Sequence, residues 1–462
     1  MLFATAEFAP LARVGGLGAA AAGYVAELRR QGVEVQVALP DYGGHELTGE
    51  TVRTLEVPGW AGPAKARSGV PAGSNAGSIT LIEVPGIRRS HPYLQPDGNG
   101  WLDNDQRFFA FSAAVGALAE LDRPDILHLN DWHTSTTLAH LATPPPTVLT
   151  IHTLGYQGQA DPRWVQAFGH RREQFLFGGA CNPLVGGVRG ADLVISVSPH
   201  YTEEITTDEG GFGVAQVLRD KRDRLVGILN GIDPDEWDPG NDSHLDVSYG
   251  PSDLSPKLTL RTRLLAEAGL TDGGGPVMVM VTRLVHQKGV DLIVPIVRYL
   301  DSFGARMVVL GSGEHHLVDA LTKCAHENPD LLSFVNGYDE GLAHRMFGGA
   351  DMLVMPSRFE PCGLAQMQAM RYGTLPLVAD VGGLHDTVID IDTFPTAGTG
   401  VVIPEPTSIA LLDGMHRMNR AFNQPRRRAA MRRRGMQSDW SWTQPTQRHI
   451  QWYQRLVTSL SD

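Results

Sequence analysis

Short apolar runs and longer amphipathic segments alternate along this sequence. The apolar runs read MLFATAE, VEVQVALP, ITLIEVP, DILHLN, TVLTIH, ADLVISVS and RLVGILNG, then, after an interruption, PVMVMVTRL, RMVVLGSG, DLLSFVNGY, ADMLVMPS and TLPLVADVG. Segments of helical length, such as 18–31 and 107–121, separate most of them. Apolar strands that alternate with helices are typical of parallel sheets buried on both faces. The pattern predicts an α/β fold of doubly wound sheets, and because it runs twice, it predicts two domains.

The interruption marks the predicted domain boundary. Residues 234–256 are rich in Pro, Gly, Ser and Asp, a composition typical of an interdomain linker. We therefore predict an N-terminal domain at 1–240 and a C-terminal domain at 241–440. The last segment, 441–462, predicts a helix that packs back onto the first domain. The Gly-, Ala- and Ser-rich stretch 62–78 is predicted to be a mobile loop.

Composition argues against several classes of partner. The chain has 462 residues and a formal net charge of -12, which disfavours a phosphate-backbone partner such as nucleic acid. Its three widely spaced cysteines indicate a reducing compartment rather than disulfides or a zinc site. No signal-like segment or long apolar span is evident, so we expect a cytoplasmic protein with no membrane partner. The oligomeric state stays open.

A glycine-rich turn, ARVGGLG, follows the first predicted strand and opens a helix. Glycine allows close approach of the backbone to a bound group, and the free amides of a helix start attract phosphate. The spacing of Gly15, Gly16 and Gly18 departs from a dinucleotide fingerprint, and no acidic residue ends the next strand. A nicotinamide-dependent dehydrogenase is therefore disfavoured.

Three charged residues follow strands of the second predicted domain. Arg283 and Lys288 come just after one strand, and two such cations can converge on a departing diphosphate. Glu360 follows the strand ADMLVMP and precedes a helix, where it could act as a helix cap or accept hydrogen bonds from a ligand. Because ligands bind at the carboxyl ends of strands in such sheets, we expect these residues in one donor site.

Six motifs together resemble the glycogen and starch synthase family. They are EFAPLARVGGLG, LNDWHTS, LNGIDPDEWDP, VTRLVHQKG, GYDEGLAHRMFGGAD and SRFEPCGLAQMQAMRYGTLPLVADVGGLHDTV, and they span nearly the whole chain. The resemblance implies a retaining glycosyltransferase of the GT-B class, with two Rossmann-like domains facing a deep cleft. It also implies a nucleotide diphosphate sugar bound mainly by the second domain and an oligosaccharide acceptor bound mainly by the first.

The resemblance assigns roles residue by residue. The catalytic set would be Glu360, which holds the donor sugar hydroxyls, Arg283 and Lys288, which stabilise the departing diphosphate, and His152, which lies beside the reacting carbon. The donor-binding set would be Gly15, Gly16, Gly311, Tyr338, Gly363 and Leu364, with Tyr338 stacking on the nucleobase. The acceptor side would comprise Arg13, Asp131, His133, Tyr156 and Asn182. No metal and no cofactor other than the sugar nucleotide is expected, because cations already meet the leaving group.

Departures from the family pattern gather on the acceptor side. Ala19 stands where the family has Asp, Thr153 where it has Asn, and Val185 where it has Lys. An apolar Val185 surface would suit a small specialised acceptor, for example an amine reached by a pseudo-glycosyltransferase that transfers a sugar or a cyclitol. Transfer to a small specialised acceptor is the main functional hypothesis. The alternatives are an ordinary ADP-glucose glycogen synthase that extends an α-1,4-glucan, and a catalytically silent carbohydrate-binding protein.

Overall fold

The computed structural model describes residues 1–74, 76–96 and 98–459, and the chain divides into two compact units. Unit 1 comprises Met1–Gly231 and Trp442–Asp462, and unit 2 comprises Ile232–Ser441. The boundary comes before the predicted 240/241 because the start of the linker packs on unit 2. There the Ile232 amide donates to the Trp440 carbonyl at 2.8 Å, and the Trp237 ring stacks on His344 with centroids 4.0 Å apart.

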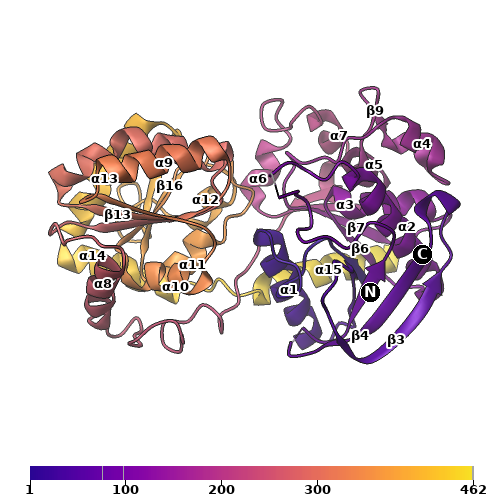
Figure 1. Cartoon of the computed structure of the whole chain (residues 1–462), viewed down its shortest axis with the longest axis horizontal. Helices are drawn as coiled ribbons and strands as arrows, with labels where there is room; N and C mark the ends of the chain where they lie inside the picture. The colour runs from indigo at the N-terminus through magenta and orange to yellow at the C-terminus, as the bar shows by residue number, and fades with distance from the viewer. Residues whose placement is uncertain (75, 97, 460–462) are drawn as a thin grey trace. The chain divides into compact units, whose positions relative to one another are not determined.

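Unit 1 is built on a nine-stranded sheet of order β11-β10-β7-β6-β1-β2-β5-β4-β3. In Figure 1, α1 and α15 lie on one side of this sheet and α2, α3 and α5 on the other. The strands are β1 (Leu2–Ala4), β2 (Gln36–Pro40), β3 (Leu47–Leu55), β4 (Ala64–Pro71), β5 (Ile79–Glu83), β6 (Leu127–Asn130), β7 (Thr147–Ile151), β10 (Leu193–Ser196) and β11 (Leu225–Gly227), with a separate pair β8 (Leu176–Phe177) and β9 (Ala180–Cys181). The helices are α1 (Gly16–Arg30), α2 (Asn104–Asp122), α3 (Trp132–Ser135), α4 (Arg163–Ala167), α5 (Pro183–Gly190), α6 (Pro199–Glu204), α7 (Ala215–Arg219) and α15 (Thr443–Ser459).

One edge of this sheet corrects the prediction of a mobile loop at 62–78. Residues 64–71 form β4, which pairs antiparallel with both β3 and β5. The strand turns Ala64 and Ala66 into the core, where they are 1% and 0% exposed. Small residues give a weak period-two pattern, so the strand was not visible in the sequence. Residue 75 lies outside the described part of the chain.

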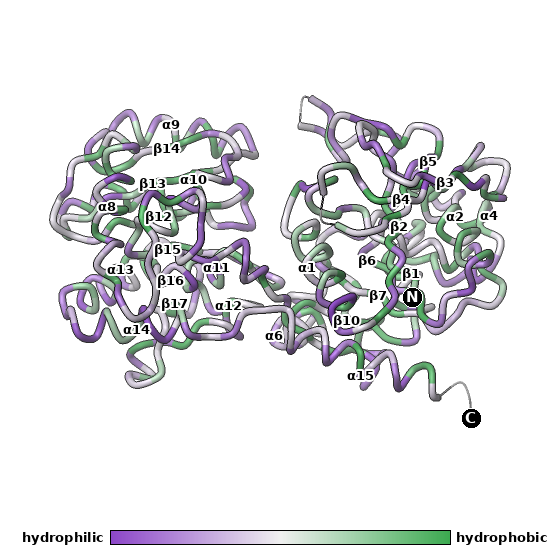
Figure 2. Tube along the Cα trace, turned by 90° about the horizontal axis from the view of Figure 1, so that it is seen from below, coloured by the Kyte–Doolittle hydropathy of each residue, from purple (hydrophilic) through white to green (hydrophobic). Residues whose placement is uncertain are grey.

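The C-terminal helix packs onto unit 1 as predicted. The Tyr453 hydroxyl of α15 lies 2.6 Å from His128 Nδ1 on β6, and it also hydrogen-bonds the hydroxyl of Tyr24 on α1. Trp442, just before α15, is 5% exposed and lies against Gly23, where its ring fills the space a side chain would need. Hydrophobic and hydrophilic positions alternate along α15 in Figure 2, as expected for a helix with one buried face.

Unit 2 holds an all-parallel six-stranded sheet of order β14-β13-β12-β15-β16-β17. Its strands are β12 (Val277–Val281), β13 (Arg306–Gly311), β14 (Leu332–Asn336), β15 (Met352–Met355), β16 (Leu375–Ala379) and β17 (Val401–Ile403). Its helices are α8 (Pro256–Glu267), α9 (His315–Glu327), α10 (Glu340–Gly349), α11 (Ala365–Arg371), α12 (Gly382–Thr387), α13 (Ser408–Phe422) and α14 (Pro425–Gln437). In Figure 1, α9 and α13 lie on one face of the sheet and α10, α11 and α14 on the other.

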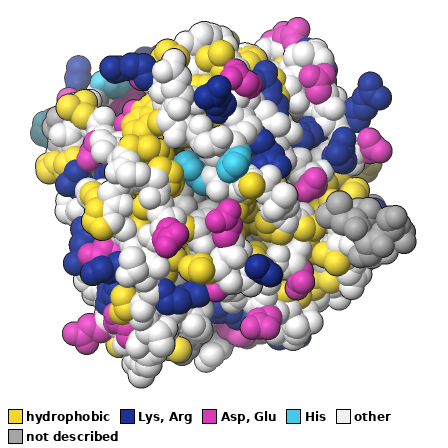
Figure 3. Space-filling model, turned by 90° about the vertical axis from the view of Figure 1, so that its right-hand side faces the viewer, with side chains coloured by type: hydrophobic (Ala, Val, Ile, Leu, Met, Phe, Trp, Pro, Cys, Tyr) yellow, Lys and Arg dark blue, Asp and Glu magenta, His cyan; other side chains and the backbone are white. Residues whose placement is uncertain are grey.

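One face of the molecule shows how the charged side chains are distributed. On the face drawn in Figure 3, positive and negative side chains are interspersed rather than gathered by sign. None of the helices in the described part of the chain combines the length and apolarity needed to cross a membrane.

Candidate active site

Strand order explains why the predicted site residues lie where they do. In unit 2 the chain builds outward from β12 to β13 and β14, then crosses back to β15 and continues to β16 and β17. The order therefore reverses between β12 and β15, and a crevice opens at the carboxyl ends of strands at such a switch point. Lys288 follows β12 and Glu360 follows β15. In unit 1 the same reversal lies between β1 and β6, which Glu7 and Asp131 follow.

Lys288 and Glu360 form an ion pair at the switch point of unit 2. Lys288 Nζ lies 2.5 Å from Glu360 Oε2, and the Ser357 hydroxyl donates to the same oxygen at 3.1 Å. Glu360 is 4% exposed. Among the described residues, Glu360 Oε1 has no hydrogen-bond partner. Glu360 therefore keeps its charge balanced through one oxygen while the other can accept a hydrogen bond from a ligand.

A network of hydrogen bonds holds the two loops that carry this pair. The Arg358 guanidinium donates to both carboxylate oxygens of Asp291, at 2.8 and 2.7 Å. The Arg358 amide donates to the Gln287 carbonyl at 2.8 Å, and Gln287 Nε2 donates to the Phe359 carbonyl at 3.0 Å. Bonds in both directions fix the loop after β15 against the 3-10 turn His286–Lys288, so the pair is held by backbone as well as by charge.

Arg283, unlike Lys288 and Glu360, has an exposed side chain. It lies two residues beyond the end of β12, and its guanidinium has no hydrogen bond or ion pair with the described residues. A cation held at a strand end without a protein partner can pair with an anionic ligand. Its assigned role at the diphosphate stays a prediction.

The predicted donor-binding residues lie at the ends of neighbouring strands. Gly311 ends β13, and a side chain there would clash with the Thr282 carbonyl, since its Cβ would lie 2.0 Å away. Gly363 has a φ of 72° in the turn before α11, and neither its amide nor that of Leu364 donates to a described residue. Tyr338 is 72% exposed after β14, as stacking on a planar ring requires.

Glu7 organises the glycine turn of unit 1, a role that sequence reasoning missed. Glu7 Oε2 accepts the amides of Val14 and Gly15 at 2.8 and 3.1 Å, and Oε1 accepts the Tyr93 hydroxyl at 2.8 Å. The Gly15 amide is thus not available to a phosphate. Gly16, exposed at the start of α1, keeps the predicted role. An acidic residue at the end of a buried strand was the only signal in the sequence.

His152 ends up beside Asn130 and Asp131. Its Nε2 lies 2.9 Å from Asn130 Oδ1, and because Asn130 Nδ2 donates to the Ala4 carbonyl, His152 carries its proton on Nε2. The His152 amide donates to Asp131 Oδ1 at 2.7 Å. Burial lowers the pKa of His152 to about 3, so the imidazole is neutral at physiological pH.

Asp131 combines backbone strain with a buried carboxyl. Its φ of 53° and ψ of -170° lie in a region that non-glycine residues rarely adopt. Burial raises the pKa of its carboxyl to about 7, against the amides of His152 and Thr153, which lower it. The strain and the burial both cost stability, and such costs concentrate at functional sites.

The raised pKa predicts how Asp131 affects stability. In the unfolded chain the carboxyl titrates near 3.8, so from about pH 4 to pH 7 the folded state binds more protons, and its stability falls as the pH rises. The Asp131→Asn variant lacks this loss. The free energy of unfolding of the wild type should therefore fall between pH 5 and pH 8 by roughly 1–3 kcal/mol more than that of the variant. Urea unfolding of both proteins at the two pH values measures this, and parallel pH dependences would contradict it.

The acceptor-side residues separate into buried and exposed groups. Asn182 is 0% exposed; it caps α5 by accepting the Val185 amide and donates to Gln157 Oε1 at 2.8 Å. Through Gln157 it holds the turn that carries Tyr156, which is 57% exposed, and its assignment to the acceptor side stays a prediction. His133 is also buried, against the rings of Trp132 and Phe108. Arg13 is exposed in the loop before α1.

A hollow of about 470 Å³ lies beside this turn within unit 1. It is lined by Trp132, residues 155–159 and Phe212. Gly158, with a φ of 68°, lies so close to the Trp132 ring that a Cβ would clash with it. Aromatic rings beside an exposed polar side chain, here that of Gln159, are surfaces of a kind that can stack on sugar rings.

The prediction that Val185 gives the acceptor site an apolar surface is wrong. Val185 is 1% exposed inside α5, so its side chain belongs to the core of unit 1. Ala19 is half-buried in α1. The replacement at 185 is therefore an adjustment of packing and is not evidence for an unusual acceptor.

Two units built on mainly parallel sheets, with charged groups at the carboxyl ends of their strands, have the architecture of a GT-B glycosyltransferase, and the comparisons specify which kind. The family model described as the starch synthase catalytic domain matches residues 1–220, and the one described as glycosyl transferases group 1 matches residues 263–437. The chain is 38% identical to a glycogen synthase of Halorhodospira halophila and 37% identical to one of Marinobacter nauticus; these alignments cover 99% of this chain, and 99% and 98% of those relatives.

Comparison with a solved structure gives the same family. The catalytic domain of starch synthase IV from Arabidopsis thaliana, bound to ADP and acarbose, superposes with a TM-score of 0.89 at 29% identity over 99% of both chains. The chain belongs to the glycogen and starch synthase family.

Proposed function

We propose that this protein transfers glucose from ADP-glucose to the end of an α-1,4-glucan, with the donor's configuration retained. The observation that carries the proposal is the Glu360 carboxylate, which is paired with Lys288 through Oε2 and open at Oε1. A group of this kind can accept donor-sugar hydroxyls while Lys288 stays in place for the leaving diphosphate. A silent carbohydrate-binding protein would have no need of this buried pair.

Arg283 and Lys288 supply the charge that the leaving group needs. As the bond between the sugar and the diphosphate breaks, negative charge builds up on the phosphate oxygens, and fixed cations stabilise that charge. The amides of Gly363 and Leu364 add donors without requiring a side chain. The transfer itself therefore needs no metal ion in this proposal.

The acceptor is proposed to be a glucan for two reasons. The relatives at 38% and 37% identity are named glycogen synthases, which favours the ordinary synthase over a small specialised acceptor. The hollow beside Trp132, Tyr156 and Phe212 offers aromatic faces to sugar rings of an oligosaccharide. Once Val185 is placed in the core, no described side chain specifically favours an amine nucleophile.

The proposal predicts incorporation of glucose into glycogen. Purified protein with ADP-glucose should elongate glycogen at a rate typical of enzymes, roughly ten turnovers per second. UDP-glucose and GDP-glucose serve as matched donors, and an amino-sugar oligosaccharide serves as the competing acceptor. Faster transfer to the amino sugar than to glycogen would overturn the acceptor assignment, and faster transfer from another nucleotide would overturn the donor assignment.

A further inference from the structure

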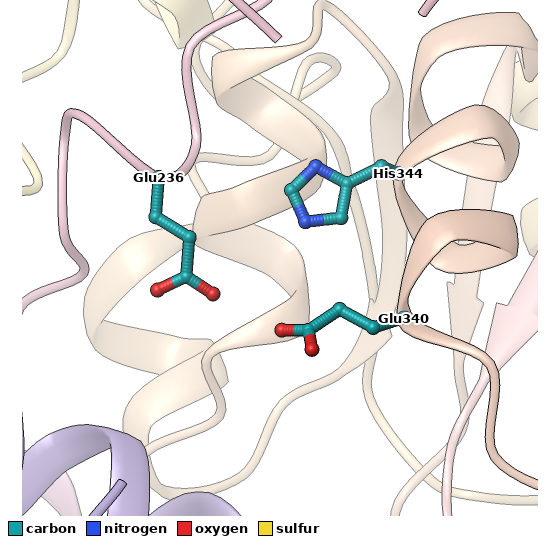
Figure 4. A group of neighbouring side chains, drawn as sticks. All are labelled: Glu236, Glu340 and His344. Atoms are coloured by element: carbon teal, nitrogen blue, oxygen red, sulfur yellow. The ribbon is translucent and has the colours of Figure 1, made fainter. Parts of the chain in front are cut away.

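A second cluster of potential ligand atoms lies in unit 2, outside the Lys288–Glu360 pair. Glu340 and His344 are four residues apart on α10, so they share one face of the helix. Glu236 comes from the linker segment that packs on unit 2. One ligand atom from each of the three residues lies within 4.8 Å of the other two. Figure 4 shows the two carboxylates pointing toward each other, on the side of the His344 ring where one of its nitrogens lies.

The orientation of His344 is fixed from its other side. Its Nδ1 lies 2.8 Å from Asp242 Oδ2, and the Tyr372 hydroxyl donates to the same carboxylate oxygen at 2.5 Å. The Trp237 ring stacks on the imidazole at 4.0 Å with an interplanar angle of 15°. With Nδ1 donating to Asp242, Nε2 keeps its lone pair, and Nε2 is the nitrogen that faces the two glutamates (Figure 4). A carboxylate behind a histidine is the usual support for a metal ligand.

We propose that Glu236, Glu340 and His344 bind a divalent transition-metal cation, with zinc as the best fit. One imidazole nitrogen and two carboxylate oxygens suit zinc and leave a fourth position for water. Metal bonds of about 2.1 Å require ligand atoms roughly 3.4 Å apart, so the carboxylates must move inward by about an ångström. Glu236 is exposed on a loop and Glu340 is half-buried at the first turn of α10, so both can make that movement.

A bound cation would fasten the linker to the start of α10. Glu340 is two residues beyond Tyr338, so the ion would also fix the turn that presents this ring. If the proposed function holds and Tyr338 stacks on the donor base, zinc should tighten nucleotide binding. Zinc binding itself is measured without nucleotide, so it stands or falls independently of the proposed function.

The test is a zinc titration of metal-stripped protein, followed by calorimetry, on the wild type and three variants with the same loss of one carboxylate charge. Glu236→Gln and Glu340→Gln each remove a ligand. Glu405→Gln is the matched control, since Glu405 is exposed in unit 2 and outside the cluster. We expect one zinc site in the wild type and in Glu405→Gln, weakened at least tenfold in the two ligand variants. Magnesium should not compete.

Two results would overturn the proposal: no stoichiometric zinc binding by the wild type, or equal binding by the wild type and both ligand variants. Melting temperatures without zinc establish that the variants are folded. If Glu340→Gln fails to fold, Glu236→Gln decides the matter, because Glu236 lies on an exposed loop. Anomalous scattering from zinc-soaked crystals gives an independent readout, with a peak expected between the three side chains and nowhere else of equal height in unit 2.

Discussion

Glu360→Gln is expected to lower kcat by about a hundredfold to a thousandfold while leaving the protein folded. Glutamine keeps the shape and can still accept the Ser357 hydroxyl, but it cannot balance the charge of Lys288 or bind a sugar hydroxyl as a carboxylate does. Losing a charged group at the reacting centre costs roughly 3–4 kcal/mol of transition-state stabilisation. Steady-state kinetics with ADP-glucose and glycogen measure the change.

Lys288→Ala, which removes the other member of the ion pair, should lower kcat by a similar factor. Its removal leaves Glu360, which is 4% exposed, without a cation, so a lower melting temperature is expected as well. Glu327→Gln, an exposed carboxylate on α9, is the control for the loss of one charge in unit 2. Turnover close to that of the wild type in either Glu360→Gln or Lys288→Ala would refute the assignment of the donor site.

Glu7→Ala is expected to lower kcat/KM by roughly a hundredfold. The Glu7 carboxylate accepts three hydrogen bonds, from the amides of Val14 and Gly15 and from the Tyr93 hydroxyl. Each unmade bond at a buried group costs about 1–3 kcal/mol, and part of that cost falls on the geometry of the glycine turn. Glu56→Ala, at an exposed position in the same unit, is the matched control.

A folded Glu7→Ala protein with normal kinetics would show that the glycine turn does not depend on Glu7. Loss of folding alone would leave the role in catalysis undecided, so Tyr93→Phe is measured as well. That variant removes only one of the three bonds and should lose activity by about tenfold or less. An unchanged rate for both variants would contradict the account of this turn.

The main architecture was predictable because it depends on a hydrophobic pattern that extends over many residues, so no single residue alters it. Apolar strands that alternate with helices predicted two mainly parallel sheets, and the segment 441–462 was predicted to be a helix that packs back onto the first domain, where α15 lies. The hairpin of β3 and β4 escaped notice because β3 is largely exposed and β4 buries small side chains. An edge hairpin of this kind has little hydrophobic signal.

The candidate site was predictable where strand ends determine it. Lys288 and Glu360 follow adjacent strands at a switch point, so the topology brings them together. The burial of side chains was harder to predict. The sequence analysis placed Asn182 and Val185 on the acceptor side, yet Asn182 caps α5 and Val185 lies in the core of unit 1. Glu7 was missed because its partners are backbone amides, which no sequence pattern reveals.

The central claim is transfer of glucose from ADP-glucose to a glucan with retained configuration. The most direct measurement is a carbon-13 NMR spectrum of a maltooligosaccharide incubated with the protein and ADP-glucose labelled at the anomeric carbon. We expect a new labelled signal of an α-1,4 linkage, absent with Glu360→Gln. A labelled β linkage, or label that never enters the glucan while the wild-type protein is folded, would contradict it.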